Sequence, residues 1–392
     1  MESNYSIGSN TELETVELFR GYPDALLQFA VACCVIFILI GIPGNLITVI
    51  ALGCCKKFRN ATAIFIINLH VNNLIFCCMI LPLTSFNYSY RHWIFGNTMC
   101  SVYSLMKYAL NGTAHFTVVA ITINRYIMVC HPLMYPRIYK RRSLIISVLS
   151  TWIAGFTLFL PSFLGVWGKF GLDPKGIDCT MIPDQNHVSP KIFFVCLAFA
   201  GPYLIISVCY GRIWWTVRKK MKECRNHNVR TILPITSSSG SEISGAENGD
   251  VCQEASVHKG SKDHEKLKLS SSVNLTPDGT ENKMMKFFKY SFRITKKENQ
   301  LTLPTRKDKK LATMILAILI SFAICHLPLM LTRALYGEYK SNPAVNILAH
   351  LLEYCTSFIS PIIYVIMSNE YRQAYKSLFE DFKSKVTALF KS

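Results

Sequence analysis

The sequence predicts an all-α membrane protein, in which a bundle of seven transmembrane helices is followed by a short amphipathic eighth helix. Three observations support this fold class. The composition is 51% hydrophobic and only 17% charged, whereas about a quarter of the residues in a soluble domain are charged. Apolar runs recur that reach the length of about 20 residues needed to cross a hydrocarbon core. The basic residues lie mainly in the segments beside these runs.

Each apolar run is expected to form one membrane-spanning helix. The second, third and seventh runs contain Asn, His, Lys or Glu, so their ends are less sharply marked than those of the others. The runs cover residues 25–53, 61–86, 97–130, 143–166, 190–219, 306–334 and 341–367. Residues 25–219 therefore hold the first five helices and residues 306–367 the last two, with 1–24, 220–305 and 368–392 outside the bundle.

Basic residues beside the runs predict the orientation of the chain. Short loops after the first and third runs are basic, and the positive-inside rule places such loops in the cytoplasm. The charged residues of 1–24 are acids apart from Arg20, so the N-terminus is expected outside the cell. The net charge of +18 then reflects topology and attraction to anionic lipid, and nucleic acid is not an expected partner. Because a basic start and a short apolar core are missing at the N-terminus, the first run is expected to act as an uncleaved targeting signal.

The two cytoplasmic segments differ in pattern. The centre of residues 220–305 is rich in Ser, Gly and acids and cannot bury enough apolar surface to fold, so this loop is expected to be disordered. Its basic, aromatic stretch at 283–297 is either a lipid-surface helix or a flexible arm. In residues 368–392 the apolar side chains recur at helical spacing, which predicts an amphipathic helix on the inner leaflet. These side chains are Tyr371, Tyr375, Leu378, Phe379 and Phe382.

Two of the 15 cysteines differ from the rest in their position. Cys100 stands at the outer start of the third run and Cys179 in the loop after the fourth, both on the oxidising side of the membrane. A disulfide between them would tie that loop over the bundle. The outer segments also hold two Asn-x-Ser sequons, at Asn4 and Asn87, of which Asn4 is the better candidate for glycosylation.

Apolar length alone does not distinguish a receptor from a transporter, so the polar residues and prolines within the runs carry the decision. In chain order these are Gly44-Asn45, Asn68-Leu-His-Val-Asn-Asn73, Asn124-Arg125-Tyr126, Trp152, Pro202 with Tyr210, Phe322 to Pro328 with His326 between them, and Ser360-Pro361-Ile-Ile-Tyr364. Together they resemble the rhodopsin-like (class A) G-protein-coupled receptors over nearly the whole chain. The inverted repeats of transporters and the catalytic runs of membrane enzymes are not seen in the sequence.

The resemblance implies a plasma-membrane receptor without enzymatic activity or cofactor. Such a receptor binds a small-molecule, lipid or peptide ligand in the outer half of its bundle and activates a heterotrimeric G protein. Arrestin and a receptor kinase are further partners that it implies. Arg125 would meet the G protein, and Tyr210 and Tyr364 would swing toward it in the active state. Pro202, Pro328 and Pro361 each remove a helical hydrogen bond, and the resulting kinks give the bundle two packings.

The departures from the family pattern affect the ion site and the switch. Asn73, Ala114 and Ser360 stand where the family usually has an Asp, a hydroxyl and an Asn that hold a sodium ion, so sodium regulation is doubtful. Asn124 replaces the acid that usually precedes the central Arg, and His326 replaces the usual Trp before Pro328. Asp308, near the start of the sixth run, is expected to bridge to Arg125, or else to be a solvated charge among basic neighbours.

A finer resemblance rests on Asn124-Arg-Tyr and on residues 160–180. These residues look like those of the insect trapped-in-endoderm and moody receptors. That likeness would imply roles in guided cell migration and epithelial organisation.

The outer half of the bundle is the default ligand pocket. A lone charge inside the membrane costs of order 3 kcal/mol, so Lys107 and Glu353 need partners. They form an ion pair with each other, or Lys107 and Arg333 present positive charge to an anionic or lipid-like ligand. The candidate ligand residues are Lys107, Tyr108, Asn111, Arg333, His350 and Glu353. His115 and His326 are expected to be satisfied core histidines, and no metal site is predicted.

Overall fold

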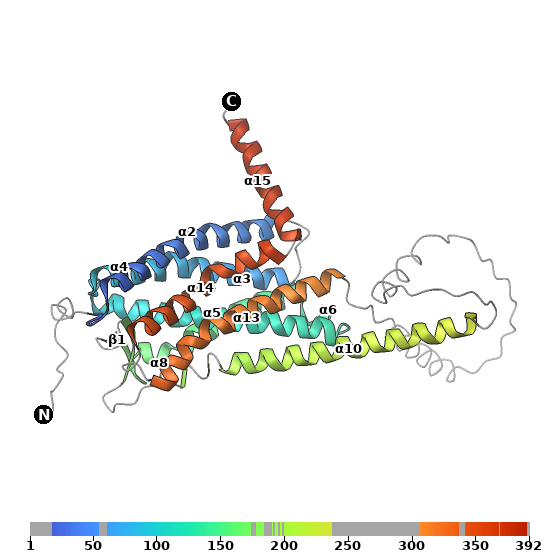
Figure 1. Ribbon diagram of the computed structural model, residues 1–392, viewed down its shortest axis with the longest axis horizontal. Helices are drawn as coiled ribbons and strands as arrows, with labels where there is room; N and C mark the ends of the chain where they lie inside the picture. The colour runs from blue at the N-terminus through green and yellow to red at the C-terminus, as the bar shows by residue number, and fades with distance from the viewer. Residues whose placement is uncertain are drawn as a thin grey trace, which may run out of the picture. The chain divides into compact units, whose positions relative to one another are not determined.

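The computed structural model describes residues 18–54, 61–173, 178–183, 190, 193–194, 197, 200–236, 306–336, 342–367 and 369–389 (Figure 1). The chain divides into two compact units, residues 1–214 with 310–392 and residues 215–309. The first unit holds the helix bundle.

The bundle is built from long helices that run side by side (Figure 1). A π-helical turn, η2, joins α3 to α4, so the three together form the second span. In chain order the helices are α2 (Asp24–Cys54), α3 (Ala61–Ile75), η2 (Phe76–Ile80), α4 (Leu81–Tyr90), α5 (Gly96–Cys130), α6 (Tyr135–Ile138), α7 (Arg141–Thr157), α8 (Leu160–Phe163), α10 (Gly201–Thr236), α13 (Arg306–Tyr336), α14 (Pro343–Met367) and α15 (Asn369–Leu389).

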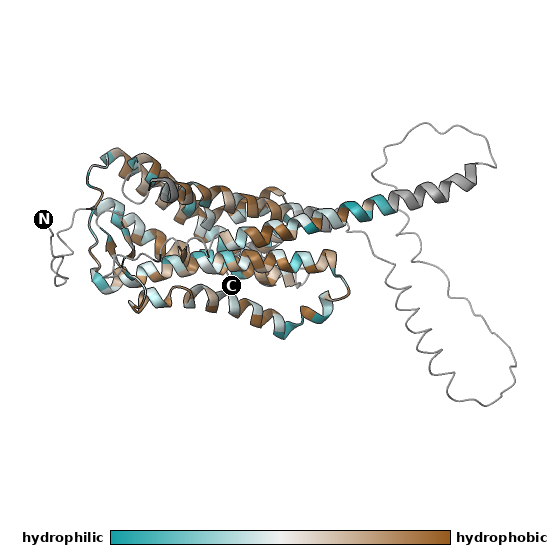
Figure 2. Cartoon of the chain, turned by 90° about the horizontal axis from the view of Figure 1, so that it is seen from below, coloured by the Kyte–Doolittle hydropathy of each residue, from teal (hydrophilic) through white to brown (hydrophobic). Residues whose placement is uncertain are grey.

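Within the described residues, six helices have the length and apolar composition of a membrane span: Asp24–Cys54, Ala61–Tyr90, Gly96–Cys130, Arg141–Phe163, Thr313–Thr332 and Pro343–Met367. Figure 2 shows hydrophobic colouring along these helices. The fifth predicted run corresponds to the start of α10, and residues 184–199 before that helix are described only in part. The apolar runs therefore located the helices of the bundle.

The helix α10 ends later than the sequence predicted. It continues to Thr236, whereas the composition predicts a disordered loop from residue 220 onward. Residues 218–224 are rich in Arg, Lys, Met and Glu, which favour the helix over its alternatives by their propensity. The remainder of that predicted loop, residues 237–305, lies outside the described residues, as does the basic stretch at 283–297.

Close approach of α5 and α7 depends on one glycine. A Cβ atom added at Gly155 of α7 would lie 2.9 Å from the carbonyl oxygen of Ala109 on α5. Asn68 of α3 is hydrogen-bonded to both of these helices. Its amide nitrogen donates to Thr117 Oγ1 on α5 at 2.8 Å, and its Oδ1 accepts from Trp152 Nε1 on α7 at 2.8 Å. The polar residues Asn68 and Trp152 therefore hold three helices together.

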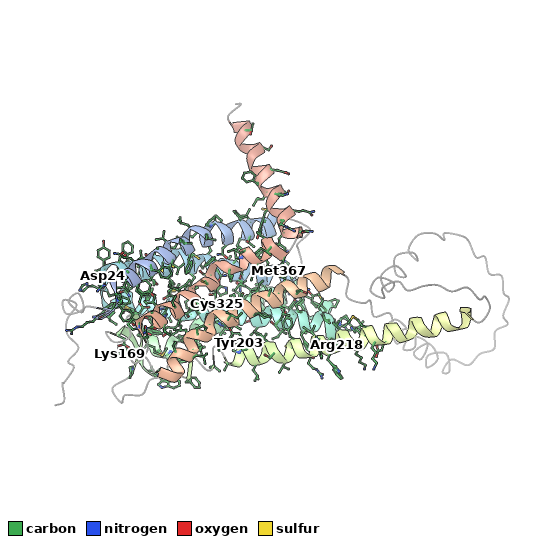
Figure 3. The ribbon with its side chains drawn as sticks, viewed as in Figure 1. Asp24, Lys169, Tyr203, Arg218, Cys325 and Met367 are labelled. Carbon is green, nitrogen blue, oxygen red and sulfur yellow. A yellow bond between two sulfur atoms is a disulfide. The ribbon has the colours of Figure 1, made fainter. Side chains whose placement is uncertain are left out.

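A two-stranded hairpin covers one end of the bundle. Strand β1 (Lys169–Asp173) pairs antiparallel with β2 (Asp178–Ile182), with Leu172 opposite Cys179. The predicted disulfide is confirmed, since Cys100 at the start of α5 is bonded to Cys179 with a Cα–Cα distance of 5.4 Å. Figure 3 shows Asp24 and Lys169 at this disulfide end and Met367 toward the other, which we call the α15 end.

The helix predicted after residue 368 is present as α15. Its first turns pack on the bundle, where Tyr371 stacks on Tyr364 at 4.8 Å between ring centroids and Tyr375 Oη lies 2.8 Å from Thr48 Oγ1. Burial raises the pKa of Tyr375, and the hydrogen bond with Thr48 lowers it by less. Phe379, which the spacing placed on the same apolar face, is 70% exposed, and the position of α15 on the inner leaflet stays a prediction.

Candidate functional site

The disulfide end holds a buried ion pair between the bundle and the hairpin. Lys107 Nζ of α5 lies 2.6 Å from Asp178 Oδ2 of β2, and the two side chains are 9% and 11% exposed. The sequence explains this placement, because Asp178 immediately precedes Cys179 and the disulfide holds that part of β2 against α5. The hairpin thus inserts a carboxylate among the residues predicted to bind ligand.

Asp178 also accepts hydrogen bonds from its other neighbours. Tyr103 Oη donates to Oδ2 at 3.3 Å, Asn87 Nδ2 to Oδ1 at 3.4 Å, and the Cys179 backbone N–H to Oδ1 at 2.8 Å. A buried carboxylate is stable only with a cation and hydrogen bonds around it. Asp178 has both, so it is firmly held in this state of the protein.

Two aromatic rings flank the ammonium group of Lys107. The nitrogen lies 5.7 Å from the ring centroid of Tyr103 and 5.6 Å from that of Tyr354. These distances are in the range of cation–π attraction. Lys107 therefore stands in a small site of one carboxylate and two ring faces.

The interpretation that Lys107 and Glu353 form an ion pair is wrong. Lys107 pairs with Asp178, and Glu353 accepts a hydrogen bond from Asn111 Nδ2 at 3.0 Å with His350 Nδ1 3.7 Å away. The hairpin supplies the partner of Lys107, and how deeply that hairpin reaches into the bundle cannot be predicted from the spacing of apolar residues. The structure thus brings Asn111, His350 and Glu353 together as a second polar group, and the side chain of Arg333 lies outside the described residues.

Tyr108 ties the hairpin to the same end of α5. Its hydroxyl lies 2.8 Å from Thr180 Oγ1, and its ring stacks on Phe170 with centroids 5.8 Å apart. The ring of Phe159 also packs against the Tyr108 ring, with centroids 5.6 Å apart. Tyr108 is therefore a support for the loop as well as a candidate ligand residue.

Two histidines meet in the middle of the bundle. His115 and His326 lie with ring centroids 4.6 Å apart, and Phe322 is 5.9 Å from His326. His115 Nδ1 donates to the Asn111 carbonyl oxygen at 2.7 Å. Since Asn111 also bonds Glu353, the histidine pair is linked to the polar group near the disulfide end.

A third polar network, which sequence reasoning missed, joins α2, α3 and α14. His70 Nδ1 donates to Asn45 Oδ1 at 2.7 Å, and Asn45 Nδ2 donates to the Ser357 carbonyl oxygen at 2.8 Å. The His70 ring also meets Tyr364 edge to face at 5.2 Å. The signal available was spacing: His70 lies three residues before Asn73 on α3 and shares its helix face.

Arg125 is buried near the α15 end. Its side chain is 3% exposed and its Nη1 lies 3.6 Å from Met128 Sδ. The preceding Asn124 accepts from Thr62 Oγ1 at 2.8 Å and donates to Tyr135 Oη at 3.4 Å. Asn124 therefore makes neutral contacts with α3 and α6 where an acid was expected in the family.

Other predicted switch residues lie around the same core. Tyr364 is fully buried and Tyr210 packs against the cluster that contains it. Tyr126 Oη lies 3.2 Å from His131 Nε2. Pro328 and Pro361 are inside α13 and α14, while the side chain of Asp308 is outside the described residues.

Comparison with known proteins identifies the family. The model of the 7 transmembrane receptor (rhodopsin family) matches residues 44–364, most of the chain. The chain belongs to this family. It is 32% identical to the G-protein coupled receptor moody of Drosophila melanogaster over 91% of this chain and 52% of that protein. It is 31% identical to Protein trapped in endoderm-1 of the same species, over 91% of this chain and 79% of the relative.

A solved structure supports the fold. Squid rhodopsin superposes with a TM-score of 0.65 at 20% identity, covering 96% of this chain and 91% of that one. The receptor spans about half the length of the moody proteins it matches. It is accordingly a multi-pass plasma-membrane protein of class A, a family of receptors rather than enzymes.

The structure argues against glycosylation of the receptor at Asn87. This residue lies in α4, is 2% exposed, and directs its amide to Asp178. A glycan needs an exposed amide nitrogen, whereas the sequon pattern contains no information on burial. Asn4, the other predicted site, lies outside the described residues.

The positions of the family's sodium site are all buried in the receptor. Asn73, Ala114 and Ser360 are 3%, 5% and 0% exposed. None of the three carries a negative charge, and a hard cation needs oxygen ligands with compensating charge. The expectation that sodium does not regulate this receptor stays a prediction.

Proposed function

We propose that the receptor binds its ligand at an extracellular disulfide end and meets the G protein at a cytoplasmic α15 end, with the N-terminus outside the cell. Two features support this orientation. Arg141 and Arg142 begin α7 at the α15 end, as the positive-inside rule requires of a cytoplasmic loop. The disulfide lies at the opposite end, where the compartment must be oxidising.

The buried ion pair between Lys107 and Asp178, 2.6 Å apart, is the observation that supports the proposed class of ligand. A buried ammonium group needs an anion, and removing that anion without replacement costs about 3–5 kcal/mol. Asp178 comes from a hairpin outside the bundle, so a movement of β2 would open the position beside Lys107. A ligand that fills it must bring a negative group of its own.

The ligand is therefore an anionic or lipid-like molecule with a carboxylate or phosphate that replaces Asp178 beside Lys107. The rings of Tyr103 and Tyr354 flank this position and would contact the apolar part next to the anion. Tyr108, Asn111, Arg333, His350 and Glu353 complete the proposed ligand set.

The test uses cells that express the receptor with a panel of G-protein sensors. Basal activity is recorded first, and a library of carboxylates and phosphates follows. Lys107→Ala should lower the potency of an anionic agonist at least about tenfold, because a buried charge pair is lost. Lys169→Ala is the matched control, since Lys169 lies on the same hairpin but is exposed. Unchanged potency in Lys107→Ala for every agonist found would exclude this ligand class.

The opposite end would act on the G protein through Arg125, with Tyr210 and Tyr364 moving toward it. Nucleotide exchange by purified G proteins, measured with the purified receptor, tests the coupling and identifies the preferred subtype. The exposed Phe379 side of α15 would lie on the inner leaflet. Arrestin and a receptor kinase are the further partners proposed at this face.

For the physiological role, we propose guided cell migration or epithelial organisation, supported by the likeness to the trapped-in-endoderm and moody receptors. Cells that lack the receptor should migrate without direction, or an epithelium that lacks it should leak. Normal migration and an intact epithelium after complete loss of the receptor would contradict this role.

A further inference from the structure

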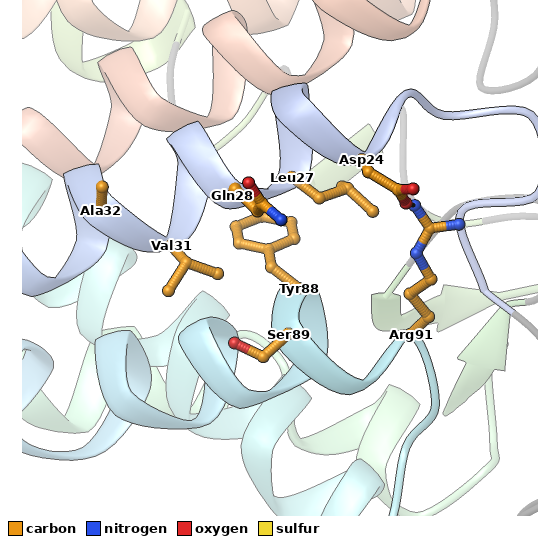
Figure 4. A pocket seen from close by; sticks show the side chains of 8 residues that line it. All are labelled: Asp24, Leu27, Gln28, Val31, Ala32, Tyr88, Ser89 and Arg91. Atoms are coloured by element: carbon orange, nitrogen blue, oxygen red, sulfur yellow. Dashed lines mark hydrogen bonds and ion pairs between the residues drawn. The ribbon is translucent and has the colours of Figure 1, made fainter.

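A separate cavity lies between α2 and α4 at the disulfide end (Figure 4). Its volume is about 340 Å³, which is within the usual range of small-molecule sites. Its lining comes from the first turns of α2 and the last turn of α4, and it does not include Lys107 or its partners. It is therefore distinct from the proposed ligand site.

The lining of this cavity changes from charged to apolar along α2. Asp24 and Arg91 lie at one end of it, and Leu27, Val31 and Ala32 continue the α2 wall beside the polar Gln28, with Tyr88 and Ser89 on the α4 side (Figure 4). Ala32 is eight residues after Asp24, which corresponds to about 12 Å along a helix. A charged end followed by an apolar wall of this length matches a headgroup followed by an acyl chain.

The residues beside the cavity are those of a lipid-facing surface. Phe29 on α2 is 51% exposed, and Phe86 and Tyr90 on α4 are 47% and 56% exposed. Aromatic side chains at the end of a membrane span are typical of the interface between headgroups and hydrocarbon. The cavity accordingly opens where an outer-leaflet lipid would lie, given the orientation proposed above.

Each of the two charged residues at the cavity lies at the end of its own helix. Asp24 is the first residue of α2 and Arg91 is the C-cap of α4, so each charge is favourable to its own helix dipole. They form an ion pair, and Arg91 Nη2 also donates to the Tyr22 carbonyl oxygen at 3.3 Å. The side chain of Asp24 is nevertheless 81% exposed and that of Arg91 26%. Both side chains therefore have exposed area at which a further charged group can bind.

We propose that this cavity binds one phospholipid with a zwitterionic phosphocholine headgroup. The phosphate lies at Arg91, the trimethylammonium group at Asp24, and one acyl chain along Leu27, Val31 and Ala32. An anionic headgroup would meet the carboxylate of Asp24, and a cationic one the guanidinium of Arg91. Asp24 and Arg91 already neutralise each other, so a zwitterionic headgroup can contact both without adding a net charge to the site, and an Arg–phosphate contact is a strong form of hydrogen bond.

Native mass spectrometry of the full-length receptor in detergent tests the lipid class. Phosphatidylcholine and phosphatidylglycerol of the same chains are added in equal amounts, with free phosphocholine as a soluble competitor. Phosphatidylcholine should be retained at least about threefold better. Arg91→Gln and Asp24→Asn should each lower its retention about threefold, as expected for partly exposed charge pairs.

Substitutions in the apolar wall test the position of the chain. Ala32→Trp fills the cavity and should abolish the preferential retention, whereas Leu39→Trp, on the exposed part of α2 beyond the cavity, should not change it. If Ala32→Trp does not fold, Ser89→Trp on α4 tests the same space. Equal retention of phosphatidylglycerol, loss of the lipid to free phosphocholine, or full retention after the cavity is filled would each overturn the proposal. Agonist potency at Lys107 is a separate measurement, so failure here leaves the proposed function standing.

Discussion

The two ends of the bundle stabilise a buried cation in different ways. At the disulfide end, Lys107 is neutralised by the carboxylate of Asp178, which a covalent bond at the next residue holds in place. At the α15 end, Arg125 follows a neutral Asn124 that bonds Thr62 and Tyr135. The first arrangement pairs two opposite charges, whereas the contacts of Asn124 in the second are neutral hydrogen bonds worth about 1 kcal/mol each.

The largest expected effect is the loss of one partner of the Lys107–Asp178 pair. Lys107→Met should lower the stability of the purified receptor by about 3–5 kcal/mol, because the buried carboxylate keeps no cation. Asp178→Leu should cost a similar amount, and the double variant should recover most of the loss. Thermal unfolding in detergent without ligand measures all three. Lys169→Gln on the same hairpin should have little effect, and additive losses in the double variant would show that the pair is not coupled.

The disulfide comes next in expected size. Cys100→Ser and Cys179→Ser should each cost about 2–5 kcal/mol, the range for a native bridge. They should reduce surface expression or signalling to the same degree, since either change removes the same bond. The double variant should be no worse than a single one. Clearly additive losses would mean that each cysteine acts independently of the bond.

These two contacts also show what the sequence could and could not predict. Apolar length and basic loops are local properties, so they located the helices, and the two cysteines indicated the bridge. The partner of Lys107 depends on how deeply the hairpin reaches, which no local pattern contains. For the same reason the sequon makes Asn87 a candidate for glycosylation, after Asn4, although its side chain is buried against Asp178.

The network at His70 was missed for a different reason. In the sequence, His70 appears only as a polar interruption of the second apolar run. Its role depends on contacts with Asn45 and Tyr364, which are distant in the chain. Helix-face spacing from Asn73 could have placed it toward the bundle, but it could not identify those partners.

This network gives an intermediate expected effect. His70→Phe keeps the ring but removes the donor to Asn45 Oδ1, so a buried acceptor loses its hydrogen bond. The cost should be about 1–3 kcal/mol. Thermal unfolding measures it, with His92→Phe as a control because His92 is half-buried and its hydrogen bond, to the Tyr90 carbonyl oxygen, is exposed to solvent. If the two variants unfold at the same temperature, the hydrogen bond does not stabilise this state.

The smallest expected effect concerns the switch itself, where Asn124 stands in place of the usual acid. Asn124→Asp would keep the acceptor for Thr62 and add a negative charge beside Arg125, which should favour the resting state. Asp308, if it bridges to Arg125, supplies the remaining charge, and a partly exposed pair of this kind is worth about 1 kcal/mol. Such an energy shifts a two-state equilibrium roughly fivefold.

Ligand-free signalling should therefore be measurable in the native receptor, lower in Asn124→Asp and higher in Asp308→Asn. G-protein sensors at matched surface expression measure this, with Lys307→Gln as a control for charge at the same helix end. Higher basal signalling in Asn124→Asp, or no change in Asp308→Asn, would show that the resting state depends on other contacts of Arg125.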